Sequence, residues 1–138
     1  MKKVSKMGIF DFLKRHSKTY QARISLDFSD KKIVQNKWVE IENLLKLGRP
    51  SNFQKAVLEA DKIVDFVLKK MQFSGETMAD RMKSAQNRFS NYQTYQALWD
   101  AHKIRNRIVH EMQSEVLNYE AKEAIEKFKK ALNNLGAI

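Results

Sequence analysis

Residues 51–71 have the sequence SNFQKAVLEADKIVDFVLKKM, and this stretch does most to decide the fold. Its apolar residues recur every three or four positions, which is the spacing of one face of an α-helix. Ser51 and Gln54 have the spacing of a capping box, so the sequence predicts a helix that starts there and ends near Met71. The residues expected on its buried face are Phe53, Val57, Ala60, Ile63, Val64, Val67, Leu68 and Met71. A face this broad must pack against several other elements.

The same spacing predicts further helices at residues 30–47, 77–89, 91–112 and 118–135. Ser29 or Asp30 is a candidate cap for the first of them, and Gly48 stands where a left-handed C-cap belongs. The whole chain contains one proline and four glycines, which favours long uninterrupted helices. We therefore expect an all-α fold, an up-and-down bundle of four to five main helices formed by residues 30–138.

Residues 1–29 are expected to form a separate N-terminal arm and connector. Within them, residues 8–20 have the pattern of an amphipathic helix, with Ile9, Phe12 and Leu13 on one face and basic residues on the other. Three roles for this segment remain open, namely docking on the bundle, binding RNA, and lying on a membrane surface through residues 7–20.

The net charge of +10 is concentrated at the N-terminus, where residues 1–25 carry seven lysines and arginines against a single acid, Asp11. A basic balance favours polyanionic partners, although it also serves solubility alone. No apolar run approaches the ~20 residues needed to cross a bilayer, and the basic start does not resemble a signal peptide. We expect a cytoplasmic protein.

Cysteine is absent, which excludes disulfides, thiolate nucleophiles and cysteine-ligated metals. The histidines, His16, His102 and His110, do not have the spacing of metal ligands. The sequence therefore predicts no metal site and no cofactor.

The most informative short motif is Arg105-Asn106-Arg107-Ile108-Val109-His110, in the helix expected at residues 91–112. On a helical wheel Lys103 and Arg107 fall on the solvated stripe, whereas Arg105, Asn106 and His110 fall on a broad arc shared with apolar residues. His102 lies on the same arc. Burying that many polar groups is costly unless they are paired or line a wet interface. The pattern indicates a groove or a subunit interface.

Arg105, Asn106 and His110 resemble the signature of the HEPN superfamily, whose all-α domains carry an arginine, a polar residue and, a few positions later, a histidine. The resemblance covers roughly residues 30–135 and rests on the motif and the order of helices. Members with a nucleotidyltransferase partner often have a tyrosine two residues after the histidine, where this chain has Met112. The resemblance implies a two-fold dimer with a composite site, and metal-independent cleavage of RNA in many members.

The chemistry of the three residues agrees with that activity. His110 can take the proton of a ribose 2′-hydroxyl, and its symmetry mate can protonate the leaving 5′-oxygen. Arg105 can stabilise the charge that develops on phosphorus, and Asn106 can orient the imidazole or a phosphate oxygen. Since Arg105 and His110 are about 140° apart on an ideal helix, one copy does not easily aim both at one phosphate.

The favoured hypothesis is a ribonuclease, toxin-like or defence-related, with RNA or nucleotide and an antitoxin protein as partners. Two alternatives remain open. The first is a catalytically inactive helical module that binds nucleotide, nucleic acid or protein through the same groove. The second gives Arg105 and His110 only structural roles within the bundle. Further candidate contacts to nucleic acid are His102, Lys103, Arg107 and Arg88, although each also fits a satisfied core residue or a solvated face. Tyr92, Tyr95 and Trp99 have the spacing of core residues, with a platform for stacking bases as the alternative.

Overall fold

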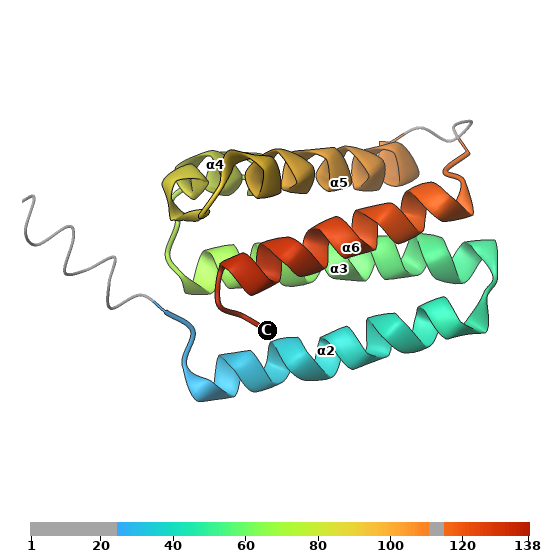
Figure 1. The fold of residues 1–138 in the computed structure, drawn as a ribbon, viewed down its shortest axis with the longest axis horizontal. Coiled ribbons are helices and arrows are strands. Elements are labelled where there is room, and N and C mark those ends of the chain that lie inside the picture. The colour runs from blue at the N-terminus through green and yellow to red at the C-terminus, as the bar shows by residue number, and fades with distance from the viewer. Residues whose placement is uncertain (1–24, 111–114) are drawn as a thin grey trace, which may run out of the picture.

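The computed structural model describes residues 25–110 and 115–138, and all its regular elements there are helices. They are α2 (Phe28–Leu47), α3 (Pro50–Lys70), α4 (Met78–Ser84), the 3₁₀ turn η1 (Gln86–Arg88), α5 (Tyr92–His110) and α6 (Asn118–Asn134). The long helices alternate in direction, which confirms the predicted up-and-down bundle (Figure 1). The amphipathic helix expected at residues 8–20 lies outside the described residues.

Of the four long helices, α3 has the most packing partners. Figure 1 shows α2 and α5 at opposite edges of the bundle, with α3 and α6 between them. α3 packs against α2, α4, α5 and α6, while α5 also packs along α6. The predicted buried face of α3 is confirmed from Phe53 to Leu68, and Ala121, Ala124, Ile125, Phe128 and Leu132 of α6 are buried as expected.

The structure corrects two expected helix starts. α2 begins at Phe28, because the Asp27 carboxylate, and not Ser29 or Asp30, accepts the first free backbone N–H, from Asp30 at 2.8 Å. That bond, with help from the Ser29 hydroxyl, lowers the pKa of the exposed Asp27 carboxyl. α3 starts at Pro50, whose ring is already suited to the first helical position, so Ser51 lies inside the helix and forms no capping box.

The helix expected at residues 77–89 is also wrong in length. It ends at Ser84 and is followed by the separate turn η1. The Ser84 hydroxyl donates to the Ser74 carbonyl at 2.7 Å and also lies 3.1 Å from the Asp80 carbonyl. The bond to Ser74 ties this short helix to the α3–α4 connection. Within α4 the buried residues are Met82, which is apolar, and Arg81, which is charged.

The burial of α5 changes along its length. Tyr95, Leu98, Ala101 and His102 are buried, the residues from Ile104 to Ile108 are half-buried, and Val109 and His110 are exposed. Tyr92 is 65% exposed, so its expected place in the core is wrong, whereas Tyr95, three residues later, is buried. No helix among the described residues is long and apolar enough to cross a membrane.

Candidate functional site

The motif occupies the last two turns of α5. Arg105 and Asn106 are half-buried and His110 is exposed. Val109, which precedes His110, is 44% exposed although it is apolar. The broad apolar arc of this helix is therefore not fully covered by the described part of the bundle, as the wheel predicted.

A buried carboxylate from α3 holds the inner part of the site. Asp61 is 4% exposed, and its Oδ1 lies 2.8 Å from His102 Nδ1. Its other oxygen, Oδ2, lies 3.4 Å from Arg105 Nε. Since an unpaired charge inside a protein is strongly destabilising, the arginine and the carboxylate stabilise each other here.

Asn106 orients the outer part of the guanidinium. Arg105 Nη1 donates to Asn106 Oδ1 at 3.1 Å. Together with Asp61, this bond fixes the plane of the guanidinium, and Nη2 bonds to no described side chain. A planar fork with a free edge can bind a phosphate oxygen with little loss of side-chain entropy.

Arg105 also borders a cavity of about 310 Å³ between α3, α4 and α5. Its wall consists of Asp61, Lys62, Asp65, Thr77, Met78, Ala79, His102 and Arg105. The cavity brings His102 and Arg105 to one space, whereas the exposed His110 does not line it.

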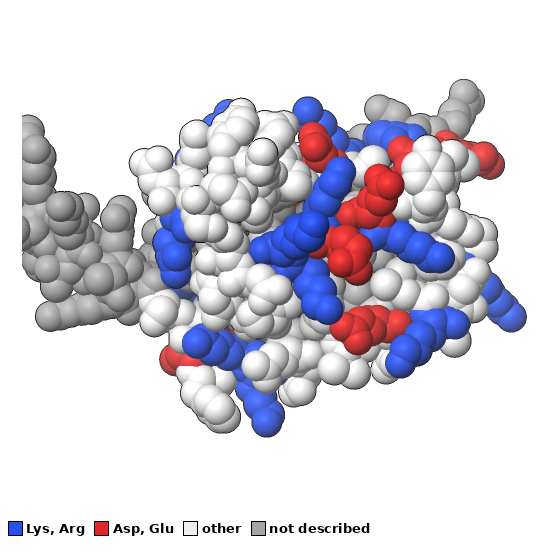
Figure 2. Space-filling view, in the orientation of Figure 1, with Lys and Arg blue, Asp and Glu red and all other residues white. Residues whose placement is uncertain are grey.

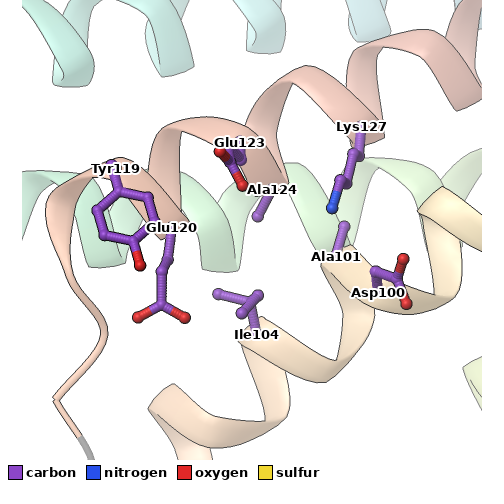
Figure 3. Close-up of a pocket in the computed structure, with 8 residues that line it drawn as sticks. All are labelled: Asp100, Ala101, Ile104, Tyr119, Glu120, Glu123, Ala124 and Lys127. Atoms are coloured by element: carbon purple, nitrogen blue, oxygen red, sulfur yellow. The ribbon is translucent and has the colours of Figure 1, made fainter.

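A second cavity, of about 290 Å³, lies on the other side of α5, against α6 (Figure 3). Asp100, Glu120 and Glu123 line it with a single lysine, Lys127, and its apolar wall includes Ile104 and Tyr119. Three carboxylates against one ammonium repel a phosphate. The pocket on the Arg105 side is less acidic, since its two carboxylates, Asp61 and Asp65, are matched by Lys62 and Arg105.

The Arg107 side chain bonds to residues at the start of α6 and just before it. Its Nη1 donates to Glu120 Oε2 at 2.6 Å and its Nη2 to the Glu115 carbonyl at 3.0 Å. The Arg107 bond, and after it the backbone N–H of Leu117, lowers the pKa of Glu120. This network ties the end of α5 to the start of α6.

The other three candidate contacts to nucleic acid, His102, Lys103 and Arg88, differ in burial and in distance from Arg105. Lys103 is exposed two residues before Arg105, on another face of the helix, and His102 is buried against Asp61. Arg88 is exposed but lies before α5, and about 20 Å of helix separates the start of α5 from Arg105. On the face that carries α6, basic and acidic side chains interleave without forming a continuous basic patch (Figure 2). The structure therefore places Lys103, and not Arg88, beside the motif.

Asp61 is the residue that sequence reasoning missed. It lies four residues after Val57 and three before Val64, inside the buried stripe of α3. A carboxylate in such a stripe is a signal in itself, because it needs a buried cation or donor from another element.

Among the described residues, no group of three or more histidines and carboxylates could hold a metal ion. The chain matches no protein-family model, no curated protein and no solved structure in the comparisons. The likeness to the HEPN superfamily accordingly rests on Arg105, Asn106, His110 and the order of the helices.

Proposed function

We propose that this chain is a HEPN-like, metal-independent endoribonuclease that acts as a homodimer in the cytoplasm. The observation that carries the proposal is the pairing of an exposed imidazole, His110, with an arginine of the same helix end that a buried carboxylate holds in place. An exposed general acid–base group beside a fixed cation suffices for transfer of a phosphoryl group by a 2′-hydroxyl.

The expected reaction needs two proton transfers. A base removes the 2′-hydroxyl proton, the 2′-oxygen attacks phosphorus, and the bond from phosphorus to the 5′-oxygen breaks as an acid protonates that oxygen. The products are a 2′,3′-cyclic phosphate and a 5′-hydroxyl. Two copies of His110, related by a two-fold axis, are the simplest source of the base and the acid, with Arg105 stabilising the charge on phosphorus.

The exposed Val109 supports the dimer. An apolar side chain between two site residues suits an isologous contact, in which each copy covers the other. Replacing Val109 with glutamate should shift the protein toward monomer in sedimentation velocity and lower RNA cleavage in parallel. Monomeric wild-type protein that cleaves RNA at full rate would contradict the composite site.

The decisive assay is cleavage of single-stranded RNA in EDTA, with the product ends analysed. His110→Ala should lower the rate by about 100-fold or more without loss of stability, since the side chain is exposed. Arg105→Lys keeps the charge but loses the fork, so it should retain only part of the rate. Arg49→Ala is the matched control, because Arg49 is an exposed arginine in the α2–α3 turn with no side-chain cap bond.

The assay also decides between catalysis and binding. Wild-type protein that binds RNA without cleaving it, and loses binding in Arg105→Lys, would show the inactive binding module instead. Cleavage that requires a divalent metal would contradict the mechanism. A toxin-like role, with an antitoxin partner, predicts that expression of the wild-type chain arrests growth and that expression of His110→Ala does not.

A further inference from the structure

His102 is buried in the bundle, yet it borders the cavity that Arg105 also lines. The two residues are three positions apart in α5, so their side chains are neighbours on one face of the helix. Arg105 and His110, by contrast, point about 140° apart. Within one subunit, His102 is therefore the imidazole better placed to share a phosphate with Arg105.

Asp61 fixes the proton of His102. A carboxylate can only accept, so the ring nitrogen facing it, Nδ1, must carry the hydrogen at 2.8 Å. A neutral imidazole then has its lone pair on Nε2. This is the arrangement in which a buried carboxylate prepares a histidine to act as a base.

The Nε2 atom is not sealed inside the core. Among the described residues, the one buried side-chain polar atom without a partner is Trp38 Nε1, and the single bond of His102 is made by Nδ1. His102 Nε2 therefore has no protein partner among the described residues and keeps some contact with solvent. His102 packs its ring edge-on against Trp99, at 6.2 Å between centroids, and lines the cavity.

We infer that His102, oriented by Asp61, is the general base of the same subunit that supplies Arg105. This inference rests on the proposed ribonuclease function and changes one part of it. His102 Nε2 takes the 2′-hydroxyl proton, Arg105 holds the phosphate, and His110 protonates the leaving 5′-oxygen. In this scheme His102 replaces one of the two copies of His110 as the base. The proton removed from the 2′-hydroxyl goes to His102 Nε2, and the proton on the leaving 5′-oxygen comes from His110.

The first test is the tautomer of the neutral His102 ring, read from its ring ¹⁵N shifts. Wild-type His102 should carry its proton on Nδ1. In Asp61→Asn the amide must turn its oxygen to Arg105, because arginine cannot accept a hydrogen bond. Its NH₂ group then faces Nδ1, and the proton of His102 moves to Nε2. A wild-type ring protonated on Nε2 would overturn the inference before any activity is measured.

The second test is kinetic and uses His102→Gln, whose side chain can still donate to Asp61 but cannot take a proton. We expect kcat to fall by about 100-fold or more, the range for loss of a general base. Affinity for a single-stranded oligodeoxynucleotide, which lacks the 2′-hydroxyl and is not cleaved, should stay within about threefold because Arg105 is kept. Asp61→Asn should lose at least as much kcat, since its His102 presents a protonated Nε2 and Arg105 loses its ionic partner.

The outcomes separate the two proposals. No cleavage by the wild-type chain refutes the ribonuclease function, whatever the tautomer. Cleavage by the wild type and by His102→Gln at similar rates, with His110→Ala inactive, refutes only the assignment of His102 and restores the pair of His110 copies. If His102→Gln fails to fold in urea titrations, Asp61→Asn decides, because an unchanged kcat with a changed tautomer would equally overturn the inference.

Discussion

Arg81 is expected to be the residue of α4 whose loss destabilises the protein most. It is 8% exposed, and its guanidinium donates from Nε to Asp65 Oδ1 at 2.7 Å, from Nη2 to Asp65 Oδ2 at 2.9 Å and from Nη1 to the Gly75 carbonyl at 2.9 Å. The bond to Asp65 raises the pKa of Arg81 above its usual range, so the guanidinium stays charged. Two of these bonds fasten α4, which walls the cavity, onto α3, and the third ties it to the α3–α4 connection.

The size of the effect follows from what remains after Arg81→Leu. Removing one partner of a buried ion pair costs about 3–5 kcal/mol, because the other charge stays buried. The Asp65 side chain retains 19% exposure and has Lys69 Nζ at 3.5 Å, which places the cost near the lower end, at about 3 kcal/mol. For a domain of this size, that corresponds to a fall in Tm of about 10 °C.

Urea unfolding monitored by circular dichroism measures the effect. Arg81→Lys keeps the charge without the fork and should lose roughly half as much. Lys83→Leu is the matched control on the same helix, since Lys83 is exposed, and it should stay within about 0.5 kcal/mol of the wild type. Adding Asp65→Leu to Arg81→Leu should recover part of the loss, because no unpaired carboxylate remains. A loss below about 1 kcal/mol for Arg81→Leu, or no recovery in the double variant, would refute this reasoning.

Three further variants test other parts of the bundle. Gly75→Ala should destabilise the fold by about 2–4 kcal/mol in urea unfolding, because Gly75 has φ of 150° and an added Cβ would lie 2.5 Å from Asp80 Cβ; a neutral result would contradict the geometry of this turn. Glu120→Gln should flatten the acid side of the curve of unfolding free energy against pH. The lowered pKa of Glu120 stabilises the fold above about pH 4.5, and this contribution is lost as the pH falls through the folded-state pKa. An unchanged acid side would show that the bond to Arg107 adds no stability. Trp38→Phe should cost less than about 2 kcal/mol in thermal unfolding, since it removes a buried N–H without a described partner, and a larger cost would show that the indole is satisfied in solution.

The sequence predicted the architecture well because apolar spacing is a local property that burial then enforces. The stripe from Phe53 to Leu68 and that of α6 could be assigned without knowing their partners. The errors lay at helix ends, where local features decide the boundary, and at single side chains such as Tyr92, whose burial depends on tertiary packing. The Asp27 carboxylate caps α2 by accepting the backbone N–H of Asp30, and α3 starts at Pro50, one residue before Ser51. Capping patterns therefore predicted these two helix starts only to within a residue or two.

For the candidate site, the sequence by itself determined which side chains the last turns of α5 carry and the angles between their directions around the helix axis. Helical geometry alone separates Arg105 from His110 and brings it beside His102. Only the tertiary structure decided which of these groups is held and which is free. The packing of α3 against α5 brings a carboxylate to a histidine 41 residues away and to Arg105, and leaves His110 exposed at the helix end. The physical reason is that hydrogen bonds within a helix are set by neighbours in sequence, whereas the partner of a buried charge is set by which helices pack together.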